Sequence, residues 1–235
     1  MIPFPRISTY GNRPDPWYKD TLIAFDSTRI VGTSGWTDYN GVPLLKGNGG
    51  AATSTIESYP DSPFGTGLMI KSGGIYWNIG ASSFPIGNYI DNDWTIDYHT
   101  KQLDAYVYPA VVHLYPLAIN TPFSAIASTS RILIAYSGGN QPGYVHLWNN
   151  SGAPVSYSSW PTTAYYGQGV WQHHAITYEK SSGLLKFYIN EVCQGSVTRT
   201  LASPGATTTA SIRTVDNANF TAAIDRYRMR AGIHY

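Results

Sequence analysis

Acidic side chains have the clearest potential for chemistry in this chain, because two carboxyl groups about 5 Å apart can cleave a glycosidic bond. Residues two apart on a β-strand point to one face and can supply such a pair. The glutamates are Glu57, Glu179 and Glu191, and none of them lies one strand step from another acid. We therefore predict that the protein is not an enzyme and has no catalytic residues.

The aspartates Asp91, Asp93 and Asp97 could instead hold a calcium ion, which takes about six to eight oxygen ligands. No loop of the chain places acids at every second position. Asp side chains also bond to nearby backbone N–H groups and so stabilise turns. We predict turn capping by these residues, no metal site and no cofactor, with Ca²⁺ as the alternative.

Two adjacent histidines, His173 and His174, resemble metal ligands by residue type. Neighbouring residues of a strand point to opposite faces, so the two rings cannot reach one ion. We predict that His173 is a hydrogen-bonded histidine of the core or an interface. The single cysteine, Cys193, excludes an internal disulfide, and we expect it to be a small buried side chain.

Arginines alternate with apolar residues near the end of the chain, at Arg226, Arg228 and Arg230. On a strand this spacing places three guanidinium groups on one face, about 6.7 Å apart. One interpretation is a solvated outer face. The other is a row of contacts for acidic groups on a partner subunit or on an anionic glycan.

An aromatic and amide-rich region lies within and just before the irregular stretch 149–169. Flat aromatic rings bind the C–H faces of sugars, and amides fix the hydroxyl groups. The alternative is that these aromatics pack beneath their own loops. The candidate glycan-binding residues are Trp148, Asn149, Asn150, Trp160, Tyr165 and Tyr166.

The composition excludes several classes of partner. The chain has 15 basic and 14 acidic residues, a balance that argues against a nucleic-acid surface or a polybasic membrane anchor. No run approaches the ~20 apolar residues of a membrane span. The start of the chain lacks a basic segment followed by an apolar one, so we expect no signal peptide.

The elements that must position these residues are short strands. Alternating or apolar runs recur between Gly, Pro, Asn and Ser clusters, and no segment sustains a helical period. This pattern predicts an all-β fold, an antiparallel β-sandwich or jelly roll of two sheets. The predicted strands are 22–26, 67–71, 75–79, 94–100, 106–118, 131–136, 144–148, 172–178, 184–190, 210–215 and 223–229.

The stretch from Gly169 to Val192 predicts a hairpin, because two alternating runs flank a polar turn at 179–183. Its pattern is a Trp, a His two residues later, a short turn and a strand ending in Tyr-Ile-Asn190, and it resembles the laminin-G-like, concanavalin A-like domain family. In that family a glycine usually follows the Asn. Here Glu191 follows, so either Asn190 alone adopts a positive φ or the turn differs.

Further segments resemble elements of the same family in the family's order: 22–26 its first strand, 64–79 a glycine turn and strand, 93–100 a core strand and 223–230 the closing strand. The segments Asp15-Pro-Trp-Tyr-Lys-Asp20 and Phe64-Gly-Thr-Gly-Leu68 are similar to those of laminin-G-like proteins of bacteriophage particles. This resemblance implies a virion structural protein, decorating the capsid or belonging to the tail. Its expected partners are other virion proteins and further copies of itself, and its expected location is the virion, after synthesis in the host bacterial cytoplasm.

Residues 1–18 contain four prolines and predict an extended N-terminal arm, followed by one laminin-G-like domain over 19–235. The arm either straps its own domain or docks on a neighbouring subunit. The alternative function is a carbohydrate-binding adhesin module for host-surface glycan. A glycoside hydrolase is a third possibility, which the spacing of the acids disfavours.

Overall fold

The structure is a computed structural model of the whole chain. Its described residues contain strands and turns and no helix, and none of these segments is an apolar helix of membrane-spanning length. The described residues are 21–27, 29–30, 36–47, 55–71, 74–78, 91–103, 114–120, 130–136, 144–148, 154–159, 169–198, 209–214 and 221–235.

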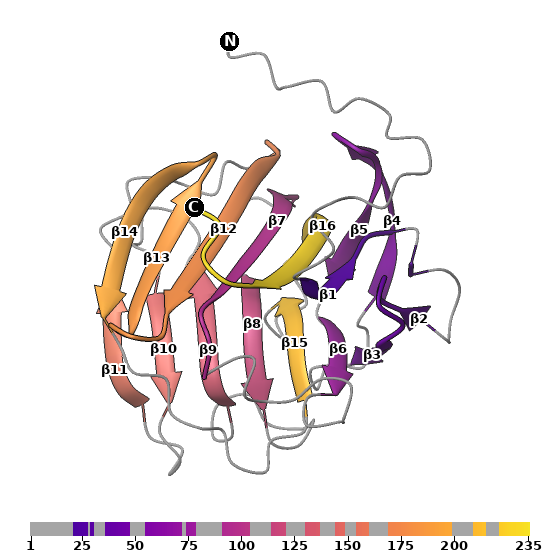
Figure 1. The fold of residues 1–235 in the computed structure, drawn as a ribbon. Coiled ribbons are helices and arrows are strands. Elements are labelled where there is room, and N and C mark those ends of the chain that lie inside the picture. The colour runs from indigo at the N-terminus through magenta and orange to yellow at the C-terminus, as the bar shows by residue number, and fades with distance from the viewer. Residues whose placement is uncertain are drawn as a thin grey trace.

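Two antiparallel sheets of eight strands lie one over the other, and sheet A forms the upper row of strands in Figure 1. Its strands follow the order β14-β13-β12-β7-β16-β5-β4, with β1 also paired to β16. They are β1 (Thr21–Phe25), β4 (Thr55–Ser62), β5 (Gly65–Lys71), β7 (Trp94–Gln102), β12 (Gln172–Glu179), β13 (Leu184–Ile189), β14 (Val192–Thr198) and β16 (Thr221–Ala231).

Sheet B forms the lower row, in the order β11-β10-β9-β8-β15-β6-β3-β2. The predicted antiparallel β-sandwich is confirmed. The strands of sheet B are β2 (Trp36–Thr37), β3 (Pro43–Gly47), β6 (Gly74–Asn78), β8 (Leu114–Asn120), β9 (Ser130–Tyr136), β10 (Tyr144–Trp148), β11 (Pro154–Ser159) and β15 (Thr209–Thr214).

The core lies between the sheets and contains an aromatic cluster contributed by both. Phe25 of β1 packs against Trp77 of β6 with ring centroids 6.2 Å apart, and Tyr227 of β16 stacks on Phe25 at 5.0 Å. Tyr98 of β7 completes the cluster, 6.1 Å from Tyr227. Each ring is at most 1% exposed, and burying one such side chain stabilises the fold by about 1.5–3 kcal/mol.

Asn190 and Glu191 form the turn between β13 and β14. Asn190 has φ 49° and Glu191 has φ 68°, so both residues adopt the left-handed conformation. The alternative in which Asn190 alone does so is wrong. Asn190 also pins β12, because its N–H donates to the His173 carbonyl at 2.8 Å and its Oδ1 accepts from the His173 N–H at 3.0 Å.

Two sequence predictions need correction. The stretch 149–169 is not wholly irregular, because Pro154–Ser159 pairs with β10 as the edge strand β11, where a proline at the first position removes no needed ladder bond. Cys193 is exposed rather than buried, because β14 is the edge strand of sheet A and follows directly on the turn. The predicted arm at 1–18 lies outside the described residues, so the division into arm and domain stays a prediction.

Candidate functional site

The outer face of sheet A, turned away from the core, carries a continuous set of polar and aromatic side chains. Across the central strands, His173 of β12 pairs with His99 of β7, and Asp97 of β7 pairs with Arg228 of β16. His174 points the other way and is fully buried against core rings. The two adjacent histidines therefore face opposite sides, as the strand period predicts.

Five rings form a row across this face, which we call the outer aromatic row: Phe64, His99, His173, Tyr235 and Tyr188. Successive centroids lie 4.5, 4.8, 5.8 and 5.2 Å apart. The row begins at the turn between β4 and β5, crosses β7 and β12, and ends on β13. Residues far apart in sequence thus form one aromatic surface.

A second aromatic pair lies near the start of β12. Trp171 packs against Tyr59 at 6.2 Å, and its indole N–H donates to the Asp61 carbonyl at 2.6 Å. Gly67 makes room for the indole, since a Cβ there would lie 3.3 Å from the Trp171 ring. Lys101 lies 5.6 Å above the Tyr59 ring and forms an ion pair with Asp61 at 2.5 Å.

Asp97 is the electrostatic centre of the outer face. Its Oδ1 lies 2.6 Å from Arg228 Nε, its Oδ2 lies 2.9 Å from Arg230 Nη2, and its side chain is 4% exposed. Burial alone would raise the pKa of Asp97, but the nearby His173 and the two guanidinium groups outweigh burial and lower it. The carboxylate is therefore ionised at neutral pH.

The histidines beside Asp97 experience different surroundings. Burial, the neighbouring His173 and the arginines lower the pKa of His99 to about 3, although Asp97 opposes the shift. His99 is therefore neutral at physiological pH. His173 Nε2 lies 4.0 Å from Asp97 Oδ1 and 3.0 Å from the hydroxyl of Tyr235.

The segment after β16 folds back over this face and brings Tyr235 onto it (Figure 1). Gly232 donates to the Asp93 carbonyl at 2.8 Å, and Thr95 Oγ1 donates to the Gly232 carbonyl at 2.8 Å. Thr95 Oγ1 also accepts from the His234 N–H at 3.2 Å. Partial burial raises the pKa of Tyr235, so its phenol stays neutral.

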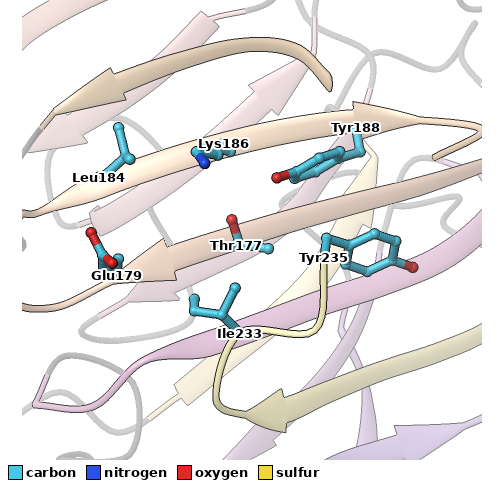
Figure 2. Close-up of a pocket in the computed structure, with 7 residues that line it drawn as sticks. All are labelled: Thr177, Glu179, Leu184, Lys186, Tyr188, Ile233 and Tyr235. Carbon is cyan, nitrogen blue, oxygen red and sulfur yellow. The ribbon is translucent and has the colours of Figure 1, made fainter. Parts of the chain in front are cut away.

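A shallow hollow of about 50 Å³ lies where this segment meets β12 and β13 (Figure 2). Tyr235 and Tyr188 present rings at one end, and Glu179 presents a carboxylate at the other. The hollow thus combines apolar ring faces with an ammonium, a hydroxyl and a carboxylate. Its lining residues are Thr177, Glu179, Leu184, Lys186, Tyr188, Ile233 and Tyr235.

The arginines predicted as a contact row have three different environments. Arg226 is exposed, Arg228 has a side chain 27% exposed, and Arg230 is buried at 2%. Both Arg228 and Arg230 hold Asp97, so much of their charge is neutralised within the protein. Whether the row binds a partner stays a prediction.

The aspartates considered for calcium are separated. Asp93 Oδ1 accepts from the Lys180 N–H at 2.7 Å, and Asp91 pairs with the Lys180 ammonium at 3.7 Å. Asp97 lies on the strand and pairs with arginines. Within the described part of the chain, no three His, Cys, Asp or Glu side chains gather as metal ligands.

The candidate glycan residues after β10 lie outside the described residues, except that the backbone of Trp148 ends β10. Their role stays a prediction. The aromatic row itself was not predicted from the sequence. The alternation of Lys186 and Tyr188 on β13 signals an outward ring, but no local pattern brings Phe64 or Tyr235 to the same face.

Comparison with known proteins agrees with this architecture. A family model described as the concanavalin A-like lectin/glucanases superfamily, Laminin_G_3, matches residues 92–230. No curated protein sequence matches the chain.

Solved structures share the fold at low sequence identity. One is the binding domain of Paraclostridial Mosquitocidal Protein 1, with TM-score 0.61 and 12% identity over 92% of this chain, which spans only 50% of that one. A second is domain 4 of AbnA, an extracellular arabinanase of Geobacillus stearothermophilus solved with arabinotriose, with TM-score 0.59 and 16% identity over 91% of this chain and 93% of that one. A third is a carbohydrate esterase from the Shiga toxin-encoding bacteriophage phi24B, with TM-score 0.58 and 10% identity over 91% and 99%.

Proposed function

Because this chain belongs to the concanavalin A-like lectin/glucanases superfamily, we propose that it is a non-enzymatic protein that binds glycan on the outer face of sheet A. The observation that carries the proposal is the outer aromatic row with the hollow at its β13 end. Aromatic faces contact the C–H surface of a sugar, while a few polar groups fix its hydroxyls. Tyr235, which is 38% exposed, supplies the ring face, with the buried Tyr188 ring packed against it at 5.2 Å, and Glu179 and Lys186 supply the polar groups.

The solved structures of similar fold support a role in recognition. The arabinanase domain was solved with arabinotriose, and the mosquitocidal chain is a binding domain. These similarities concern the fold, and the outer face of this protein itself indicates where a glycan would lie.

Asp97, the central acid of the outer face, supports binding rather than catalysis. Asp97 is held between Arg228 and Arg230, so it has no proton to give at neutral pH and its oxygens are engaged. A glycosidase needs an acid that can be protonated beside a second carboxylate, and Asp97, held ionised between two arginines, does not fit the role of that acid.

A glycan array followed by calorimetry tests the proposal. We expect Tyr235→Ala to weaken binding of an array-positive glycan about tenfold, because it removes one ring face from the hollow. Leu45→Ala is the matched control, since Leu45 is 42% exposed on β3 of the other sheet. Failure of the wild-type protein to bind any glycan, or equal affinity of Tyr235→Ala and wild type, would overturn the proposal.

We further propose that the protein works in a bacteriophage particle, as a capsid decoration or tail component in contact with other virion proteins and with copies of itself. The support is the resemblance of residues 15–20 and 64–68 to laminin-G-like proteins of such particles. Antibody labelling of intact, purified particles tests this setting. Label at a fixed position on the particle is the expected result, and particles free of the protein would contradict it.

A further inference from the structure

An exposed arginine at the β16 end of the outer aromatic row has an unusual backbone. Asp225 pairs with His99 and Arg228 pairs with Asp97, so two residues of β16, Arg226 and Tyr227, lie opposite one residue of β7. This is a β-bulge, and Arg226 within it has φ 51°. A positive φ is rare for a residue with a side chain and is often found where a binding group is positioned.

The bulge changes which face Arg226 occupies. Ile224 and Tyr227 both point into the core, although they are three residues apart. In a regular strand the residue two after Ile224 would share its inward face. The extra residue therefore keeps the Arg226 guanidinium out of the core and on the outer face, where it is exposed.

The guanidinium of Arg226 is held in a defined place. Its Cζ lies 3.9 Å from the centroid of the Phe64 ring, and Phe64 packs edge to face on His99 at 4.5 Å. The Phe64 N–H donates to Ser62 Oγ at 3.2 Å, and the Ser62 hydroxyl donates to Asp225 Oδ2. The cation–π contact fixes the position of the guanidinium without using a hydrogen-bond acceptor of the protein.

Each of the neighbouring acids has a hydrogen-bond or ion-pair partner other than the Arg226 guanidinium. Asp97 pairs with Arg228 and Arg230, and Asp61 pairs with Lys101. Asp225 accepts from the Ser62 hydroxyl and, at 2.8 Å, from the backbone N–H of Arg226. Among the described residues, no carboxylate forms an ion pair with the Arg226 guanidinium.

We propose that Arg226, held over Phe64, is a subsite for the carboxylate of an acidic sugar, so that the glycan bound on the outer face is anionic. This inference rests on the proposed glycan-binding function. A guanidinium donates two parallel hydrogen bonds to a carboxylate, which a neutral hydroxyl cannot match. From this anchor the saccharide would extend along the outer aromatic row toward the hollow beside Tyr188 and Tyr235, with each step between rings under 6 Å.

Paired ligands test the subsite: sialyllactose against lactose, and trigalacturonate against its carboxyl-reduced form. We expect the wild-type protein to bind at least one acidic member about tenfold more tightly than its neutral counterpart. A sulfated trisaccharide is a third arm, and tighter binding of the sulfated than of both carboxylated ligands would overturn the assignment to a carboxylate.

Arg226→Gly is the decisive variant, because glycine favours the positive φ of the bulge and the fold is not endangered. We expect it to lose the preference for the acidic ligand while it keeps the affinity for the neutral one. Arg226→Lys keeps the charge without the planar fork, and we expect it to keep only part of the preference. An undiminished acidic preference in Arg226→Gly overturns the subsite.

The outcomes separate the two proposals. If the wild-type protein binds no glycan at all, the proposed function fails. If it binds neutral and acidic ligands equally well, and Tyr235→Ala weakens both, glycan binding stands and the acidic subsite alone fails.

Discussion

The inner and outer faces of sheet A both carry chains of aromatic rings, yet the two sets have different surroundings. On the inner face, Phe25, Tyr98 and Tyr227 cluster with Trp77 of sheet B; each of the four rings is at most 1% exposed, and they pack among aliphatic side chains of both sheets. The outer aromatic row has similar ring spacing, but two of its five rings are histidines, and it lies beside Asp97 and the three arginines of β16. Ring packing alone therefore does not distinguish a core from a surface.

The two faces of sheet A differ in the charge state of their buried titratable groups. The inner face contains His174, which is fully buried, and burial lowers its pKa to about 3. The outer face keeps Asp97 charged by pairing it with Arg228 and Arg230. A buried apolar face stabilises the fold but cannot contact a ligand. A face of rings among fixed charges gives a ligand contact area, and the charges orient it.

The largest expected effect comes from removing the charge at the centre of the outer face. Asp97→Asn leaves two guanidinium groups without their carboxylate, one of them 3% exposed. Loss of one partner from a buried ion pair costs about 3–5 kcal/mol. We expect urea denaturation to show a loss of that size in the free energy of unfolding.

A matched substitution on the same face gives the control. Asp61→Asn breaks the ion pair with Lys101, but the Asp61 side chain is 69% exposed. Exposed pairs contribute about 0–1 kcal/mol, so the control variant should stay near the wild-type stability. Equal losses in the two variants would show that the Asp97 network is solvated like any surface pair.

Lowering the pH should reduce the stability by an intermediate amount, through one histidine on each face of sheet A. The pKa values of His99 and His174 are lowered to about 3. The unfolded chain binds protons at these residues near pH 6.5, whereas the folded chain does not, so stability falls as pH drops below 6.5 toward 3. At pH 5.5 each histidine should reduce the free energy of unfolding by about 1.4 kcal/mol relative to pH 7.5.

Single substitutions separate the two faces. His174→Gln on the inner face and His99→Gln on the outer face should each remove about 1.4 kcal/mol from the loss of stability between pH 7.5 and pH 5.5. The measurement is urea denaturation of each variant at both pH values. If only His174→Gln flattens the pH dependence, then His99 on the outer face is protonated in the folded protein at pH 5.5, whereas His174 on the inner face is not.

The strand period predicts much of the sandwich but little of its outer surface. Alternation over 172–178 and 184–190 gives the hairpin and the opposite directions of His173 and His174, which the structure confirms. The pairing of β16 with β7 and the approach of Phe64 and Tyr235 to His99 and His173 depend on contacts far apart in sequence. The bulge at Arg226 and Tyr227 breaks the alternation that follows Ile224, and the sequence pattern does not reveal this break.

The smallest expected effect concerns the turn at Asn190 and Glu191, between β13 and β14, which is hydrogen-bonded to the backbone of His173. A left-handed conformation costs an L-residue about 1–2 kcal/mol, and glycine avoids this while losing more chain entropy on folding. Glu191, at φ 68°, is exposed. We expect Glu191→Gly to raise the free energy of unfolding by about 0.5–1 kcal/mol in urea denaturation.

Glu191→Ala removes the carboxylate but keeps the strained backbone, so it should give no such gain. A gain in the alanine variant as large as in the glycine variant would mean that charge, and not φ, limits this turn. If Glu191→Gly alone gains stability, backbone strain is the limit, and the Asn190 bonds to His173 hold the register against it.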